Sequence, residues 1–345
     1  MISVKQQFRT WGQRRLLGHA IGPEYGGQGD GFAELAAAHE QLGREVADTG
    51  LILALNAHLW GGLFPILSHG SEPQCQYWLP GLLSGETVSG HAITEPQAGS
   101  DLHGLQASAR QQDGEFLLCG HKRYITNTPY ADMLVIYAHL EQGLSAFIVH
   151  RNDPGAVFLD EPKVNACESA GMGDVLLEDC RLPADRLLGS PGNGLLMVQQ
   201  ALELERAFVF AGICGILDKL LTEVTRFARK RTVREQPLAH RQTIAHRIAD
   251  IRTRLDTTRL WVRHCAQLKD AGKGITLASS QTKLLGAEGF LQSALDAVQI
   301  MGAAGLEPEG RAQRLVRDAM ASRLFSGTSE VQKNIVSAML GLGGE

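Results

Sequence analysis

Two short segments of this chain carry the polar side chains best suited to hold a flat, polar ligand. Residues 91–101 read HAITEPQAGSD, and residues 120–132 read GHKRYITNTPYAD. In each segment a short strand pattern runs into hydroxyl-bearing and small residues, which favours a strand end followed by a turn. Hydroxyls and backbone amides in such places can grip the edge of a planar cofactor. Taken singly, each Thr or Ser is explained by an ordinary turn role, so the prediction depends on the two segments together.

Glu205 is the residue best suited to move a proton. It lies within LELERAFVFAG. Apolar residues recur around it at steps of three and four, which predicts the buried stripe of a helix. The stripe consists of Val198, Ala201, Leu202, Phe208, Val209 and Gly212. A carboxylate in such surroundings is costly unless it is paired or protonated, and it suits a general base near neutral pH. A salt bridge to a neighbouring helix is the alternative role.

The elements that position these residues follow the order helices, strands, helices. Residues 1–90 show apolar residues at helical spacing, with Gly/Pro punctuation between the segments. From about residue 88 to 183, short apolar runs alternate with turn signals, which is typical of a small β-barrel or sandwich. The chain is helical again after the loop GSPGNG. We predict an α+β protein with an N-terminal helical domain at 1–90, a β-barrel domain at 91–188 and a C-terminal helical bundle at 189–345.

Composition narrows the function classes. The chain has 345 residues, 44% of them hydrophobic and 20% charged, with a formal net charge of −4, which gives no reason to expect nucleic acid as a partner. The six cysteines lack the spacing of a metal site, so we predict no metal, reduced thiols and a cytoplasmic protein. The uncharged stretch at 49–71 contains His, Asn, Gly and Pro, and we predict two buried helices there and no membrane span.

The segments quoted above resemble those of the acyl-CoA dehydrogenase family, and the resemblance covers nearly the whole chain. IGPEYGGQGD at 21–30 is similar to the family's Pro-Glu-x-Tyr-Gly-Gly-x-Gly loop, and YWLPGLLSGE at 77–86 is similar to the segment before its β-domain. The resemblance implies a C-terminal four-helix bundle. It also implies that the chain begins close to the family's second helix and is therefore N-terminally short.

The resemblance assigns FAD to the two strand-end segments. It implies that Thr94 and Thr126 contact the flavin edge, that Tyr124 lies against the ring and that Ser100 sits between flavin and thioester. The full set of implied FAD contacts is Ile93, Thr94, Ser100, Tyr124, Ile125, Thr126, Arg231, Gln242, Gln299, Gly302, Thr328 and Glu330. The residues implied on the substrate side are Ser100, Glu203, Arg206 and Gly327.

Two motifs of the family show where its proteins carry the catalytic base. LELERAFVFAG is similar to the Leu-x-x-Glu-Arg helix that carries the base in the isovaleryl- and long-chain-type members. Other members place a Glu directly before the Gly-Thr of the C-terminal motif, and Ser326 occupies that position in LFSGTSEVQ. The resemblance therefore implies α,β-dehydrogenation of an acyl thioester, with α-proton abstraction by Glu205 and β-hydride transfer to flavin N5. The thioester carrier is CoA or an acyl or peptidyl carrier protein.

The resemblance also implies partners. Arg231 and the loop at 299–305 serve the FAD of a neighbouring subunit in the family, so we expect a homodimer or homotetramer. The electron acceptor is a flavoprotein or O2. Two alternatives stay open at this point: a flavin-dependent oxidase or monooxygenase on the same fold, and a non-catalytic subunit that shares FAD with an active partner.

Overall fold

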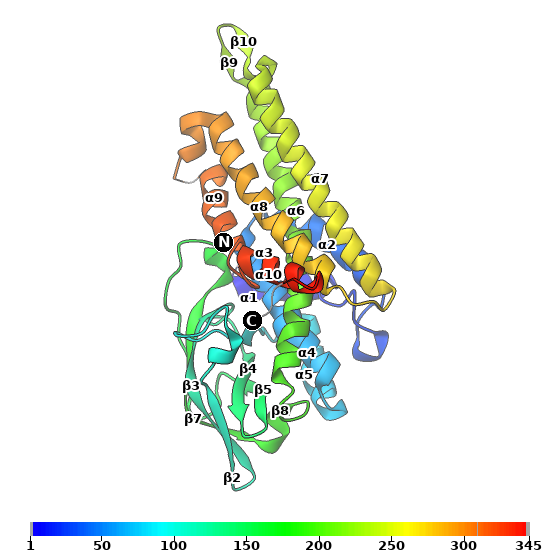
Figure 1. The fold of residues 1–345 in the computed structure, drawn as a ribbon, viewed down its shortest axis with the longest axis vertical. Coiled ribbons are helices and arrows are strands. Elements are labelled where there is room, and N and C mark those ends of the chain that lie inside the picture. The colour runs from blue at the N-terminus through cyan, green and yellow to red at the C-terminus, as the bar shows by residue number, and fades with distance from the viewer. Residues whose placement is uncertain (1–2, 309, 343–345) are drawn as a thin grey trace. The chain divides into compact units, whose positions relative to one another are not determined.

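The computed structural model describes residues 3–308 and 310–342 (Figure 1). The chain divides into two compact units. Unit 1 comprises residues 1–31, 53–164 and 168–205, and unit 2 comprises residues 32–52, 165–167 and 206–345. The long helix α6 (Gly194–Lys230) gives its first turns to unit 1 and the remainder to unit 2. The division into three domains at the predicted boundaries stays a prediction.

Helices form most of the chain before residue 90. They are α1 (Val4–Gln13), η1 (Pro23–Tyr25), α2 (Gly31–Val46), α3 (Thr49–Asn56), the π-helical segment η2 (Ala57–Leu63), α4 (Phe64–His69) and α5 (Glu72–Ser84). Local chemistry sets their ends. Ser71 caps α5 by accepting a hydrogen bond from Gln74 N, while the Gln74 side chain accepts one from Ser71 N, and Gly85 in the left-handed region closes the same helix.

The stretch predicted as two buried helices is a single helical run. It extends over Thr49–His69, and a π-helical segment that contains Gly61 and Gly62 takes the place of the predicted break. By length and composition this run would be long enough to cross a membrane. In the structure, 83% of its most apolar window is buried inside the protein, which is typical of a core helix.

The central strands of unit 1 form one sheet. Its pairing order is β6-β7-β3-β2-β4-β5-β8, and β1 pairs in parallel with β4. The bounds are β1 (His91–Ala92), β2 (Ser108–Gln112), β3 (Glu115–Ile125), β4 (Met133–Leu140), β5 (Gly143–His150), β6 (Ala156–Phe158), β7 (Gly173–Pro183) and β8 (Leu187–Leu188), with 3-10 turns η3 (Leu102–Gly104) and η5 (Ala184–Arg186). Asp113 and Gly114 both have positive φ, as expected for the tight turn that joins β2 to β3.

Unit 2 is helical. Its elements after α6 are the hairpin of β9 (Thr232–Val233) and β10 (Gln236–Pro237), η6 (Leu238–His240), α7 (Gln242–Asp270), α8 (Thr276–Met301), η7 (Gly302–Leu306), α9 (Arg311–Ser322) and α10 (Ser329–Met339). Helix α8 packs against α7, α9 and α10. In Figure 1 the β9–β10 hairpin caps one end of the α6–α7 pair. The predicted class of helices, sheet domain and helices is confirmed.

Candidate active site

The two strand-end segments of unit 1 lie side by side because a buried ion pair joins them. Lys122 Nζ lies 2.6 Å from Glu95 Oε1 and donates a second hydrogen bond to the Ile93 carbonyl at 3.1 Å. The Lys122 side chain is 0% exposed and that of Glu95 is 3% exposed. Arg123 N donates to the Thr94 carbonyl at 2.8 Å. The segments predicted to act together are therefore linked through both backbone and side chains.

The charge state of this pair follows from its surroundings. Burial raises the pKa of Glu95, but the hydrogen bonds from Lys122, Gln106 N and Ala107 N outweigh burial, so the pKa lies below its ordinary value. Burial also lowers the pKa of Lys122, and the contact with Glu95 opposes that effect. The pair holds the first segment in place, and no sequence pattern predicted it.

Asp174 on β7 fixes the second segment. Its carboxylate accepts a hydrogen bond from Tyr124 N at 3.3 Å and contacts His121 Nε2 at 2.7 Å. Tyr124 has φ of 58°, in the left-handed region that a bulky residue rarely adopts. Its ring is 49% exposed and the guanidinium of Arg123 lies 5.0 Å from the ring centre. Asp174 therefore holds an aromatic face open at the end of β3.

The predicted flavin-edge hydroxyls are available for a ligand. The side chains of Thr94 and Thr126 are half-buried, and no hydrogen bond is formed by either hydroxyl within residues 3–308 and 310–342. Ile93 and Ile125 are buried beside them, and Ser100 is exposed. Unused hydroxyls next to an open aromatic face fit the edge and face of a flavin ring.

Asn127 connects this region to the helical run before it. Its Nδ2 donates to the carbonyls of Ala54 at 2.9 Å and Ser89 at 2.8 Å. Its φ of 69° turns the chain sharply at the end of the second segment. Asn127 is fully buried, so the motif residue that follows Thr126 has a structural role.

Glu205 is buried in the last turn of α6 that belongs to unit 1. The residue is 4% exposed, and its Oε2 atom is buried without a hydrogen-bond partner in the described part of the chain. The neighbouring stripe is buried as predicted, except that Leu202 is partly exposed. His91 Nε2, on β1, lies 3.4 Å from Glu205 Oε2. The alternative of a salt bridge to a neighbouring helix is not what the structure shows, since the contact comes from a strand.

The remaining predicted residues lie in unit 2, except Glu203, which lies half-buried in unit 1. Arg206 is 8% exposed and its Nε donates to the Ser326 carbonyl at 3.0 Å. Ser326 and Gly327 have φ of 55° and 89°, and Gln332 Nε2 donates to both of their carbonyls. Burial and the nearby Arg206 lower the pKa of Lys283, on α8, to about 7. The turn at Ser326 and Gly327 is therefore held by several hydrogen bonds, and the Ser326 hydroxyl is buried.

Thr328 and Glu330 lie at the start of α10. The Thr328 hydroxyl accepts a hydrogen bond from Val331 N at 3.2 Å and so caps the helix. Its own backbone N–H and the Thr328 side chain lower the pKa of Glu330. Contacts of either residue with FAD stay a prediction, because capping alone accounts for the threonine.

Four predicted phosphate-end residues are exposed. Arg231 and Gln242 flank the β9–β10 hairpin, and Gln299 and Gly302 lie at the end of α8. Gly302 has φ of 62°, and nothing lies within 4 Å of the position where a Cβ would be. The exposed side chains and the open backbone at Gly302 could contact the phosphates of a ligand that is bound to another subunit.

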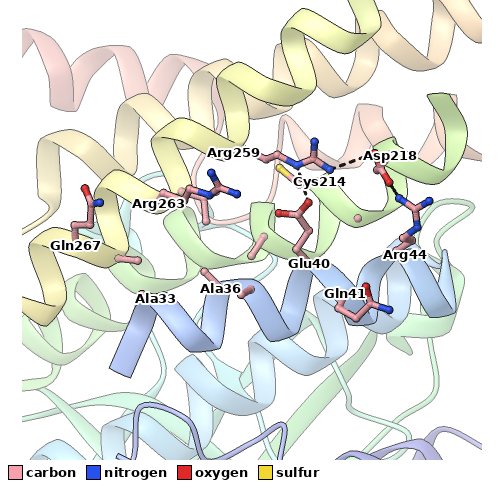
Figure 2. Close-up of a pocket in the computed structure, with 15 residues that line it drawn as sticks. Ala33, Ala36, Glu40, Gln41, Arg44, Cys214, Asp218, Arg259, Arg263 and Gln267 are labelled. Atoms are coloured by element: carbon pink, nitrogen blue, oxygen red, sulfur yellow. Dashed lines mark hydrogen bonds and ion pairs between the residues drawn. The ribbon is translucent and has the colours of Figure 1, made fainter. Parts of the chain in front are cut away.

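Unit 2 also contains a cavity. It has a volume of about 470 Å³ and is lined by α2, α6 and α7 (Figure 2). Four of its charged groups pair with one another: Arg259 contacts Glu40 at 2.6 Å and Asp218 at 3.3 Å, and Arg44 also contacts Asp218. Residues predicted for the flavin, the substrate or the base are absent from its lining, so we do not assign it to the reaction.

The sheet with its hydroxyl-rich strand ends and the buried acid on α6 define a flavoprotein of the dehydrogenase class. Comparison with known proteins gives the family. The acyl-CoA dehydrogenase N-terminal, middle and C-terminal domain models match residues 3–86, 90–180 and 192–341, so the chain belongs to the acyl-CoA dehydrogenase family. It is an FAD-dependent oxidoreductase that dehydrogenates acyl thioesters.

Individual relatives are similar over almost their full length. The L-prolyl-(peptidyl-carrier protein) dehydrogenase of Pseudomonas fluorescens is 36% identical over 98% of this chain and 90% of that protein. The solved structure of the prolyl acyl carrier protein oxidase AnaB has a TM-score of 0.95 at 32% identity, covering 99% of this chain and 92% of that chain. The FAD complex of PigA has a TM-score of 0.95 at 29% identity, covering 100% and 91%.

Proposed function

We propose that this protein dehydrogenates an acyl group held as a thioester on a carrier protein, with Glu205 as the base. The observation that carries the proposal is the burial of Glu205, which is 4% exposed and leaves Oε2 without a hydrogen-bond partner within the described residues. A carboxylate kept in such a place at a free-energy cost is typical of a site that uses it. Ser326, at the alternative position, has a hydroxyl that cannot act as a carboxylate base.

The chain's own residues divide the work. Glu205 takes the α-proton, and the electron pair of the broken C–H bond moves into the thioester carbonyl. Bound FAD would supply the acceptor for the β-hydrogen and its electron pair. Thr94 and Thr126 would hold the cofactor with their unused hydroxyls, and Tyr124 would pack its exposed ring against it. The Lys122–Glu95 pair keeps the first of these segments in place.

A prolyl group on a carrier protein is the first candidate substrate. The support is the P. fluorescens relative, named as a prolyl-carrier dehydrogenase, which matches 98% of this chain at 36% identity. For the electron acceptor, O2 is one candidate, and it is favoured by the similarity to AnaB, which is named as an oxidase. The other candidate is a flavoprotein that takes electrons from the reduced FAD, as expected if the protein acts as a dehydrogenase.

An anaerobic screen tests both points. Purified holo-protein is mixed with prolyl thioester on a carrier protein, with the same carrier bearing a butyryl group, and with butyryl-CoA, and flavin absorbance is followed. We expect rapid bleaching by the prolyl carrier and at least tenfold slower bleaching by the other two. Fastest bleaching by butyryl-CoA would reject the carrier-bound substrate. Air is then admitted to the bleached sample. Re-oxidation of the reduced flavin as fast as one catalytic turnover would identify O2 as the acceptor.

We infer a homo-oligomer from the exposed Arg231, Gln242 and Gln299. A guanidinium and two amides turned outward suit a phosphate held by another subunit. Arg231→Ala should lower FAD content without changing the oligomeric state, measured by light scattering and flavin absorbance. A wild-type holo-protein that is monomeric with one FAD per chain would refute this inference.

We place the protein in the cytoplasm. The six cysteines at 75, 119, 167, 180, 214 and 265 are free thiols. Five of them are buried. Free thiols are typical of a reducing compartment. Fractionation of cells of the source organism with an antibody against the chain tests this placement, and recovery outside the cytoplasm would contradict it.

A further inference from the structure

His91 lies next to the proposed base, Glu205, and its imidazole ring is closely surrounded by neighbouring residues. It is the first residue of β1 and pairs with Val135 of β4. Its side chain is 12% exposed, and its Nε2 lies 3.4 Å from Glu205 Oε2. A carboxylate can only accept a hydrogen bond, so the nitrogen that faces it is the one that carries the proton.

The π-helical segment Ala57–Leu63 makes room for this ring. A Cβ at Gly61 would come within 2.7 Å of His91 Cγ and 2.9 Å of His91 N, so only glycine permits the contact. A Cβ at Gly62 would come within 2.0 Å of Ser89 Oγ. Ser89 itself is tied to His58, whose Nδ1 accepts from Ser89 N at 3.1 Å. Segments of π-helix are rare and are frequent at functional sites.

Packing alone does not account for a histidine here. His91 Nδ1 is buried and has no hydrogen-bond partner within residues 3–308 and 310–342. Leaving a buried polar atom unpaired costs free energy, and a phenylalanine would fill a similar volume without that cost. The neighbouring Glu205 Oε2, 3.4 Å from Nε2, is a charged group that an imidazole N–H can face and a phenylalanine ring cannot, although the two atoms are not at hydrogen-bond geometry.

We propose that His91 is a positioning residue that orients the Glu205 carboxylate through Oε2, so that Oε1 is the atom presented to the α-hydrogen. The inference rests on the proposed role of Glu205. In the step itself the α C–H bond breaks, its electron pair stays with the substrate, and an O–H bond forms at Oε1. His91 keeps its own proton throughout and does not touch the substrate.

The test compares variants of the full-length holo-protein. His91→Phe keeps the ring volume and removes the hydrogen-bond donor, and His91→Gln keeps a donor. The control is His69→Phe, which also removes a histidine contact with α6: His69 Nε2 lies 2.8 Å from Gln200 Oε1 and not against Glu205. Melting temperature, FAD content and the anaerobic bleaching rate across substrate concentrations are measured for each variant.

We expect His91→Phe to lower the limiting bleaching rate about 10- to 100-fold, because misplacing a reacting group by a small distance has an effect of that size. The substrate concentration at half-maximal rate, the melting temperature and the FAD content should change little. His91→Gln should recover part of the rate, and His69→Phe should keep the wild-type rate. In a Glu205→Gln background, His91→Phe should have no further effect.

The failures are distinguishable. A Glu205→Gln variant that bleaches at the wild-type rate would refute the proposed base. An inactive Glu205→Gln variant together with wild-type bleaching by His91→Phe would refute only the role of His91. A His91→Phe variant that loses FAD or stability, yet bleaches normally per bound FAD, would also refute it and assign the residue to packing. A rate loss in His91→Gln equal to that in His91→Phe would exclude the polar contact with Glu205 as the cause.

Discussion

The stability of this protein should fall in mild acid because of one buried histidine. His58 is 0% exposed, and burial lowers its pKa from 6.5 to about 4. Its Nε2 donates to the Leu82 carbonyl at 3.0 Å and its Nδ1 accepts from Ser89 N at 3.1 Å, an arrangement that only the neutral ring can make.

The size and direction of the effect follow from linkage. Between pH 6.5 and about 4 the unfolded chain binds a proton at His58 and the native protein does not. The contribution of His58 to the free energy of unfolding is therefore fully present above pH 6.5 and is lost as the pH falls toward 4. The difference between the two pKa values corresponds to about 3 kcal/mol.

The assay is urea unfolding at several pH values between 7.5 and 4.5, for the wild type, His58→Gln and His246→Gln. Gln at position 58 keeps a donor for the Leu82 carbonyl but does not titrate in this range, so the variant should lose less stability on acidification than the wild type. His246 is exposed and serves as the control, with a wild-type pH dependence expected. Parallel curves for the wild type and His58→Gln would refute the reasoning.

Two further predictions concern packing and the ion pair. Lys122→Met or Glu95→Gln alone should lower the unfolding free energy by roughly 3–5 kcal/mol and weaken FAD retention, because each leaves the partner's buried charge without a counter-charge. A change below about 1 kcal/mol would contradict this, and the double variant should cost less than the sum of the two. Gly215→Ala should cost roughly 1–3 kcal/mol, since its Cβ would lie 2.0 Å from the Glu40 carbonyl where α2 meets α6. Gly274→Ala, with nothing within 4 Å, is the control for the glycine variant, and equal melting temperatures for the two would count against the close contact.

The class of fold could be predicted because its signals are local. Helical periodicity before residue 90 and after residue 194 gave the helical parts, and turn residues such as Asp113-Gly114 gave the strands between them. The prediction of two helices at 49–71 is wrong, because Gly61-Gly62 usually breaks a helix and here lies inside a π-helical segment of one continuous run. Periodicity also placed Glu205 on a buried stripe, and the structure buries it.

Contacts between distant segments could not be predicted in the same way. The Lys122–Glu95 pair joins residues that are 27 positions apart, and Asp174 meets Tyr124 from a strand 50 positions away. Nothing in the local pattern of either segment marks such a partner, because a charged residue in a strand is usually exposed. His91 is the first residue of the first segment, but its contacts with Gly61 and Glu205 depend on the fold and could not be predicted from the sequence.

The most direct test of the account is the single-turnover reduction rate of the Glu205→Gln holo-protein, measured anaerobically by rapid mixing with the substrate found in the screen. Exposed Glu178 in the same unit supplies the control variant Glu178→Gln. The account predicts that Glu205→Gln binds FAD normally and reduces it about 10²- to 10⁴-fold more slowly than the wild type, because a general base contributes a factor of that size. Reduction by Glu205→Gln at the rate of Glu178→Gln would show that another group takes the proton.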